Sequence, residues 1–132
     1  MPGTILQKGT LLIPTGGSDH LHIVINDPVY CPFQGDNVVL LVNISSVYPG
    51  KYADTTCILS PGSHRFVKHD SWVVYREAVI KRVDALETGV AQNQIRTHDP
   101  FLTDEYLRIR GGFDTSPDVK IKIARFLKQH SL

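Results

Sequence analysis

The segment Ile58–Ile80 reads ILSPGSHRFVKHDSWVVYREAVI and joins clear strand signals to the densest group of acidic, basic and hydroxyl side chains in the chain. Its apolar start is broken by a Ser-Pro-Gly turn at residues 60–62. The later stretches SWVVY (71–75) and AVIKRV (78–83) are rich in β-branched and aromatic residues, which predicts one bent strand or a pair of strands. We interpret this segment as the functional edge of a small barrel.

The preceding residues contain four further strand signals. TLLIPT (10–15) predicts a buried first strand, followed by a polar loop, TGGSD. HLHIVIN (20–26) predicts a second strand, with His20 and His22 on one face. VVLLVNISS (38–46) is the strongest strand, after a connecting loop over residues 27–37, and TTCIL (55–59) is the fourth. Short strands with little helix between them predict a small antiparallel barrel.

The residues after Asp84 have a different character. Residues 87–100 are polar without a clear period, so no element is predicted there. Thr103 is expected to cap a helix that Gly111–Gly112 ends, and Ser116 with Pro117 is expected to start a second helix. The chain is therefore predicted to be one domain, 1–132, of mainly β (α+β) class. It would comprise a barrel over about 8–84 and a C-terminal helical segment over about 102–130.

Composition limits the functional classes. The chain has 14 basic and 13 acidic side chains and a formal charge of +1, so an extended polyanion-binding surface is excluded and such a site must be local. No apolar run reaches the roughly 20 residues of a membrane span, and the start does not resemble a signal peptide. Cys31 and Cys57 lack CxxC spacing, which indicates reduced thiols. A cytoplasmic protein without membrane association is expected.

The nine residues SHRFVKHDS (63–71) carry the candidate chemistry. Imidazoles can transfer protons near neutral pH, and Arg65 with Lys68 can neutralise a phosphate. The rings of Phe66, Trp72 and Tyr75 are of the kind on which unpaired bases stack. This combination is typical of a phosphodiester-binding site. The alternative is a solvated loop, with Phe66 and Trp72 in the core.

Metal and hydrolase motifs are weak by comparison. His20 and His22 form the one local ligand pair, without an HxxxH or CxxC pattern, so neither a metal site nor a cofactor is predicted. The chain has no GxSxG motif, P-loop or dinucleotide-binding glycine pattern. A Cys57–His64 nucleophile is disfavoured because Cys57 lies inside an apolar strand.

The order of these elements resembles the PemK/MazF-like toxins. The resemblance rests on the segments LHIVIN (21–26), VVLLVNISS (38–46), KHDSWVVYREAV (68–79) and LTDEYLRI (102–109), and covers about residues 8–113. It implies an SH3-like barrel, binding and cleavage of single-stranded RNA without metal, a homodimer, and a cognate antitoxin that binds across the same groove.

The resemblance also implies roles for individual residues. Ser45 stands where the family has its strand-closing hydroxyl, while His20 replaces the arginine that opens the second strand. The family has a second arginine near the end of the strand that follows Lys-x-Asp-Ser. In this chain that position is Val79, and Arg76 lies three residues earlier. The implied catalytic set is His20 or His64 for proton transfer, Ser45 for phosphate positioning, and Arg76 or Arg65 for charge stabilisation. The implied RNA-binding set is Arg65, Lys68, His69, Trp72 and Tyr75.

Two other functional classes remain open. A barrel that lost the arginines would serve as a non-catalytic protein-protein interaction module that grips its partner with Phe66, Trp72 and Tyr75. A metal-dependent hydrolase would instead bind zinc through its histidines.

Overall fold

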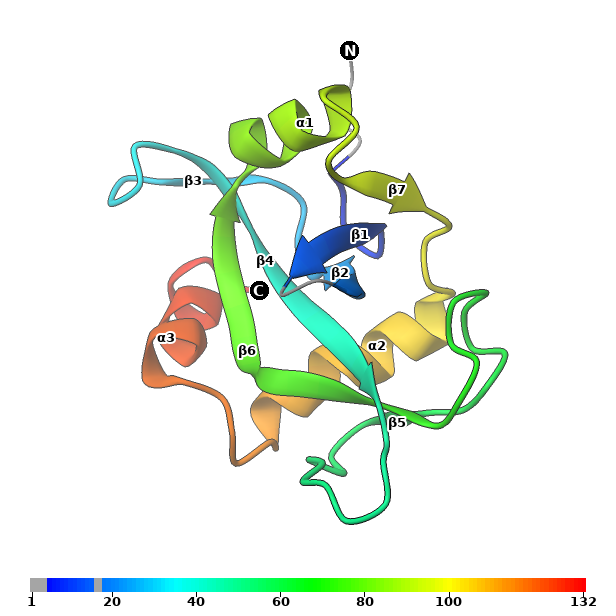
Figure 1. Cartoon of the computed structure of the whole chain (residues 1–132). Helices are drawn as coiled ribbons and strands as arrows, with labels where there is room; N and C mark the ends of the chain where they lie inside the picture. Colours follow the sequence, from blue (N-terminus) through cyan, green and yellow to red (C-terminus); the bar gives the residue numbers. More distant parts are fainter. Residues whose placement is uncertain (1–4, 16–17) are drawn as a thin grey trace.

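The computed structural model describes residues 5–15 and 18–132 (Figure 1). It contains a seven-stranded antiparallel sheet with the strand order β5-β6-β4-β2-β1-β7, and β3 pairs with β4 outside this path. The sheet curls around the α2 side of the molecule, so the predicted mainly β, α+β barrel-like architecture is confirmed. The strands are β1 (Thr10–Thr15), β2 (Ser18–Val24), β3 (Val29–Cys31), β4 (Asp36–Ser46), β5 (Ile58–Leu59), β6 (Ser71–Arg82) and β7 (Arg96–His98).

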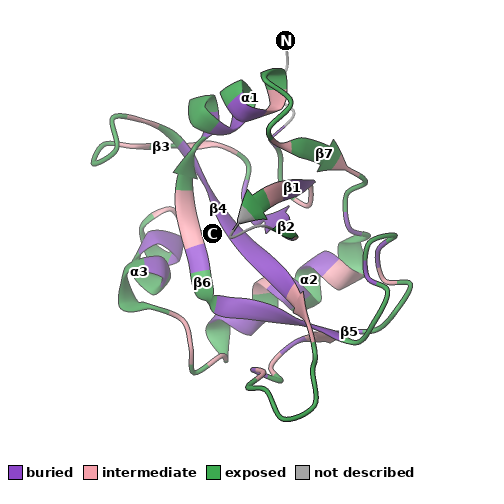
Figure 2. Ribbon diagram, viewed as in Figure 1, coloured by how far each residue is buried: buried purple, intermediate pink, exposed green. Residues whose placement is uncertain are grey.

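Strand β4 is the centre of the sheet. It pairs with β2, β3 and β6, and its residues 38–44 are all buried (Figure 2). This burial on both faces explains why VVLLVNI is a continuous apolar run and not an alternating one.

Strand β6 is a single bent strand, one of the two arrangements predicted. Its register against β4 changes from Asn43 opposite Val74 to Leu41 opposite Val79. Residues 75–78 of β6 therefore lie opposite Val42 alone, which is a large β-bulge. The bulge turns the strand and leaves Arg76 exposed at the corner.

Three elements were not predicted. Strand β3 lies inside the predicted 27–37 loop. Helix α1 (Val83–Ala91) begins at the last residue of the predicted strand 78–83 and extends into the stretch 87–100, for which no element was predicted, and strand β7 lies within that stretch. Helix α1 buries Val83 and Leu86 against the sheet, whereas β7 is a short polar strand that pairs with β1. The Gly16–Gly17 part of the predicted loop lies outside the described residues, and Ser18 already belongs to β2.

The two predicted C-terminal helices are present with shifted starts. Helix α2 (Thr103–Gly111) has Leu102 and not Thr103 as its N-cap, and it continues into a 3-10 turn, η1 (Gly112–Asp114). Helix α3 (Ile121–Gln129) begins after Lys120, because Ser116 accepts the backbone N–H of Asp118 in a turn that precedes the helix. None of the helices in the described residues is long and apolar enough to cross a membrane.

The sheet has an apolar cluster on each face. The larger cluster fills the concave side, where α2, η1 and α3 contribute Tyr106, Ile109, Phe113, Ile123 and Phe126. The smaller cluster lies on the convex side beneath α1, around Leu11, Val24, Val39, Leu41 and Leu86. Both faces of the central strands are therefore covered over part of their length.

Tyr75 joins the β6 bulge to the end of α2. Its ring is fully buried and packs edge-on against Phe113, with ring centres 4.8 Å apart. Its hydroxyl donates to the Ile109 carbonyl at 2.7 Å. Gly112 lies directly against this hydroxyl, at a distance that leaves no room for a Cβ atom.

Candidate functional site

The loop between β5 and β6, residues 60–70, closes the open side of the curled sheet and is called the closing loop. His64 is its main anchor. Its Nε2–H donates to the Asp99 carbonyl at 2.6 Å, and its Nδ1 accepts the Phe66 N–H at 3.2 Å. The buried ring also stacks near Phe101. Because both ring nitrogens are already bonded, His64 has no lone pair available for a substrate in this arrangement.

His98, on β7, is the second imidazole that packs against the closing loop. It packs edge-on against Phe66 of the closing loop, with ring centres 4.3 Å apart. Its Nε2 is buried without a hydrogen-bond partner among the described residues. Burial, with help from the nearby Arg96 and Arg65 charges, lowers the pKa of His98 below its ordinary value of 6.5.

We expect the protein to lose stability as the pH falls from 7.5 to 5.5. A histidine whose pKa is lowered by folding binds fewer protons when folded than when unfolded, so its stabilising contribution is present above pH 6.5 and is lost below it. His98→Phe keeps the ring against Phe66 but does not titrate. Denaturant unfolding at several pH values should therefore show a shallower pH dependence for His98→Phe, and an unchanged slope would contradict this.

The other charged residues of the closing loop are exposed. Arg65 pairs with Asp99 at 3.8 Å, with both side chains largely in water, and its guanidinium lies over the Phe66 ring at 5.9 Å. Such an exposed pair is weak and breaks easily for a competing anion. Lys68 and His69 are exposed as well.

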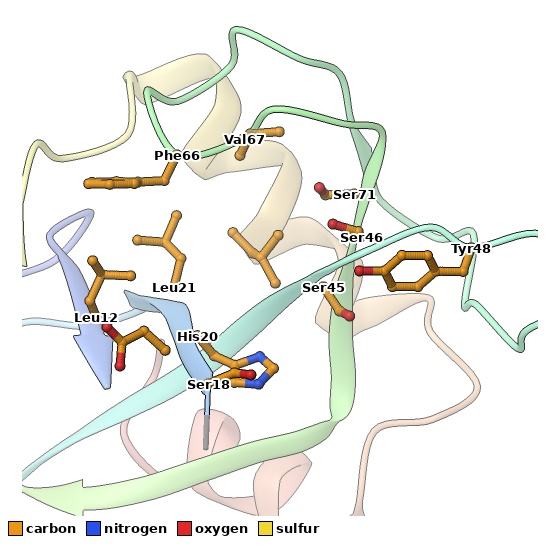
Figure 3. Close-up of a pocket in the computed structure, with 12 residues that line it drawn as sticks. Leu12, Ser18, His20, Leu21, Ser45, Ser46, Tyr48, Phe66, Val67 and Ser71 are labelled. Carbon is orange, nitrogen blue, oxygen red and sulfur yellow. The ribbon is translucent and has the colours of Figure 1, made fainter. Parts of the chain in front are cut away.

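A cavity of 430 Å³ opens where β2 and β4 separate (Figure 3). The ladder between these strands covers His22 opposite Asn43 to Val24 opposite Leu41, so the start of β2 and the end of β4 diverge beyond it. The closing loop covers the gap with Phe66 and Val67. We call this the hydroxyl cavity, and it is lined by Leu12, Ser18, Asp19, His20, Leu21, Ile44, Ser45, Ser46, Tyr48, Phe66, Val67 and Ser71.

The hydroxyl cavity has an apolar floor and a rim of neutral donors. Four serine hydroxyls and the Tyr48 phenol share the lining with the imidazole of His20. Asp19 is the acidic residue of the lining, and it is paired with Arg96 at 2.7 Å. The lining residues include no lysine or arginine, so an anion bound here would be held by hydroxyl groups and His20.

Arg76 lies outside this cavity. Its guanidinium stacks over the rings of Tyr52 and Trp72, at 5.0 and 5.6 Å from their centres. The two rings are themselves in edge-on contact at 5.8 Å. Tyr52 also donates to Asp118 at 2.7 Å, which ties the β4–β5 loop to the residues before α3.

Asp54 forms a second tie between the same two loops. Burial acts to raise the pKa of its carboxyl, but hydrogen bonds from Ser116 and Thr56 outweigh this and leave the pKa below its ordinary value of 3.8. The Ser116 hydroxyl donates at 2.5 Å, and both the backbone N–H and the hydroxyl of Thr56 donate to the other oxygen.

Asp54→Asn is expected to lower the free energy of unfolding by about 1–3 kcal/mol at pH 7, because hydrogen bonds to a charged acceptor are replaced by weaker ones and the amide donors face other donors. The lowered pKa means that this stabilisation is present above pH 3.8 and is lost as the pH falls through the folded-state value. The difference from the parent protein should thus shrink in acid. Urea unfolding of both proteins at pH 7 and pH 3 measures this difference in the free energy of unfolding. An equal difference at the two pH values would contradict the role assigned to the Asp54 carboxylate.

The structure brings part of the predicted catalytic set together. His20 and Ser45 line the same cavity from neighbouring strands. His64 does not line the cavity, because it is buried and bonded to the Asp99 carbonyl. Arg76 lies on the β6 bulge, outside the cavity. Of the predicted base-stacking rings, Tyr75 is fully buried and Trp72 nearly so, which makes neither accessible to a base in this structure.

Ser18 and Tyr48 were not identified from the sequence as site residues, and Ser71 was included in the candidate segment 63–71 without being given a role. The exposed ring of Tyr48 lines the hydroxyl cavity. The available signal was the pair of tyrosines that flank Pro49–Gly50, next to a strand ending in two serines. Within the described residues there is no group of three or more His, Cys, Asp or Glu side chains arranged to hold a metal ion.

No protein-family model, curated protein or solved structure matches this chain.

Proposed function

We propose that the protein binds single-stranded RNA at the hydroxyl cavity and cleaves it without a metal ion, as a relative of the PemK/MazF-like toxins. One observation carries this proposal: His20 and Ser45, singled out from sequence as proton-transfer and phosphate-positioning residues, line one cavity. The cavity volume of 430 Å³ falls in the range of small-ligand sites and can take a nucleotide-sized group.

In the proposed reaction His20 acts as the general base. Its imidazole takes the proton of a ribose 2′-hydroxyl, the 2′-oxygen attacks the adjacent phosphorus, and the bond to the 5′-oxygen breaks. The leaving 5′-oxygen takes a proton from water, and the imidazolium returns its proton to the solvent. The products are a 2′,3′-cyclic phosphate and a 5′-hydroxyl, so no external nucleophile is needed. Ser45 and Ser46 would donate hydrogen bonds to the phosphate oxygens, where charge accumulates in the transition state, whereas the Ser71 hydroxyl already donates to the His69 carbonyl at 2.8 Å.

Arg65 is the cation that we assign to this reaction. It extends from the closing loop beside Phe66, which lines the cavity, and its pairing with Asp99 is exposed and weak. It can therefore turn towards a bound phosphate at little cost. Arg76 is held over two aromatic rings outside the cavity, where it would contact the RNA chain beyond the cleaved bond.

Incubation of the purified protein with a mixed-sequence single-stranded RNA in excess chelator tests the proposal. Fragments ending in a 2′,3′-cyclic phosphate are expected. Absence of both cleavage and binding, with the fold intact by circular dichroism, would overturn the proposal. Cleavage that requires added zinc or magnesium would instead support a metal-dependent hydrolase.

A second candidate is the non-catalytic interaction module. It is favoured by Phe33, whose side chain is 97% exposed at the β3–β4 turn beside a groove that includes Ile80 and Phe126. An exposed apolar patch of this kind is typical of a protein-binding surface. Absence of RNA cleavage by the folded protein, together with a stable complex with a protein partner, would favour this candidate.

The proposed partners follow from the proposed family. A homodimer and a cognate antitoxin that covers the hydroxyl cavity are both proposals. Size-exclusion chromatography with light scattering tests the first. Protection of Ser45 and Tyr48 backbone amides from hydrogen exchange on addition of a candidate antitoxin tests the second.

A further inference from the structure

A second cavity, of 410 Å³, lies on the convex face of the sheet. Helix α1 covers one part of this face and leaves the part near the β6 bulge open. We call this the outer cavity; it is lined by Ile13, Pro14, His22, Leu41, Asn43, Glu77, Val79 and Lys81. Its floor is apolar and its polar groups are few and specific, which is typical of a small-ligand site.

His22 presents a defined acceptor to the outer cavity. Its Nδ1 lies 2.9 Å from the His20 carbonyl, and since a carbonyl can only accept, Nδ1 carries the proton. Burial lowers the pKa of His22, so the ring is neutral at pH 7 and Nε2 keeps its lone pair. The residue is 9% exposed, and its Nε2 has no hydrogen-bond partner among the described residues.

Asn43 lies directly across the ladder from His22, on the same face of the sheet. It is 6% exposed, and within the part of the chain that the structure describes its side-chain amide makes no hydrogen bond. Its amide atoms are not among the fully enclosed polar atoms that lack a partner, so they face the open space of the outer cavity and are available to a ligand. Two neighbouring buried side chains therefore present unused polar atoms to one cavity.

Glu77 and Lys81 supply charges of opposite sign at the rim. Both side chains are exposed, and neither forms an ion pair with another described residue. Both lie close enough to His22 to affect its pKa in opposite directions. The cavity thus offers acceptors from Glu77 and His22, a donor from Lys81, and both kinds of group from Asn43.

We propose that the outer cavity binds a guanine base. The pairing edge of guanine presents two adjacent N–H donor groups and one carbonyl acceptor, and its ring faces are apolar. Glu77 would accept from the 2-amino group and His22 from N1–H, Lys81 or Asn43 would donate to O6, and Ile13, Leu41 and Val79 would contact the ring.

The other bases match this set less well. Adenine and cytosine each present one amino donor on the pairing edge, and uracil one imino donor, so one of the two protein acceptors would be left without a partner. An unpaired buried acceptor is the main source of discrimination between closely similar ligands. A carboxylate at the rim also disfavours a ligand whose edge consists mainly of acceptors.

The outer cavity lies beside the proposed RNA site along the same two strands. His22 and Asn43 are each two residues from His20 and Ser45, which line the hydroxyl cavity. A strand of RNA that rounds the diverging ends of β2 and β4 would place a phosphate in one cavity and a neighbouring base in the other. This extension to RNA rests on the proposed function, whereas binding of the base alone does not.

Titration of the isotope-labelled protein with guanosine 5′-monophosphate, monitored by NMR, tests the inference. We expect shifts of the Asn43 side-chain amide and the His22 ring signals, and a dissociation constant about tenfold or more below those of the adenosine, cytidine and uridine monophosphates. Inosine 5′-monophosphate, which lacks the 2-amino group, should also bind about tenfold more weakly. Glu77→Gln replaces the carboxylate by a weaker, neutral acceptor and should reduce this preference for guanosine over inosine.

Two controls separate this inference from the proposed RNA cleavage. Glu87→Gln changes an exposed carboxylate on α1 outside the outer cavity and should bind guanosine monophosphate unchanged. His20→Ala should likewise keep guanine binding, whatever its effect on RNA. Shifts confined to Ser18, His20 and Ser45, equal affinity for all nucleotides, or no binding would each overturn the guanine assignment. Guanine binding without RNA cleavage would leave it standing.

Discussion

Gly112→Ala is expected to lower the free energy of unfolding by about 2–4 kcal/mol, from overpacking and the loss of a buried hydrogen bond. A Cβ atom at this position would overlap the Tyr75 hydroxyl and the ring carbon that bears it. Tyr75 cannot withdraw, because its ring is fully buried against Phe113. Relief requires η1 to move off the β6 bulge, which also breaks the bond to the Ile109 carbonyl.

The matched control is the adjacent glycine. Gly111 is the last residue of α2, and a Cβ added there meets no atom within 4 Å. Gly111→Ala should therefore leave stability unchanged or raise it by up to about 1 kcal/mol. Adding Tyr75→Phe to Gly112→Ala should recover part of the loss, because the nearest clashing atom is removed. Equal effects of the two alanine variants in urea unfolding would refute the proposed contact.

His20→Ala is expected to slow the proposed RNA cleavage about 100-fold or more, the usual contribution of a positioned general base. His20 is the imidazole that lines the hydroxyl cavity, whereas both ring nitrogens of His64 form hydrogen bonds that hold the closing loop. The rate should be measured at saturating RNA, so that a loss of kcat is separated from weaker binding. Ser45→Ala should reduce the same rate to a smaller extent, since neighbouring serines remain.

His130→Ala provides a comparison for a histidine outside the site. His130 follows α3 and packs against Phe126, away from both cavities. Its removal should leave cleavage unchanged. If His20→Ala cleaves RNA at the parental rate while folding normally, His20 is not the base. If His64→Ala alone abolishes cleavage at unchanged stability, the catalytic role belongs to His64.

The strands of this fold were predictable where burial leaves a local pattern. The run VVLLVNISS identifies β4 because both of its faces are covered, and the bend in β6 follows from the polar residues Arg76 and Glu77 between two apolar stretches. Strand β7 has no such pattern. Its three residues are polar, and its place in the sheet depends on pairing with β1, more than eighty positions earlier.

The candidate site was partly predictable for the same reason. His20 and Ser45 lie at strand ends, so their position beside one cavity follows from the strand order. The burial of Tyr75 and the hydrogen bonding of His64 depend on contacts with segments distant in the sequence, which no local pattern encodes. Helix α2 buries Tyr75 from the concave side, and the Asp99 carbonyl captures His64 from a distant segment. From sequence alone, an aromatic or imidazole side chain in a polar stretch can be either a buried structural residue or an exposed site residue.

The pairing of β1 with β7 has a consequence for synthesis of the chain on the ribosome. Strand β1 can pair with β2 as soon as both are made, but its other side receives a partner when residues 96–98 emerge. Until then the nascent sheet carries a bare row of backbone donors and acceptors along β1, which is the type of surface that recruits foreign strands. Pro14 removes one of the N–H groups from this strand near its end, and it shortens the row on which a neighbouring nascent chain could assemble.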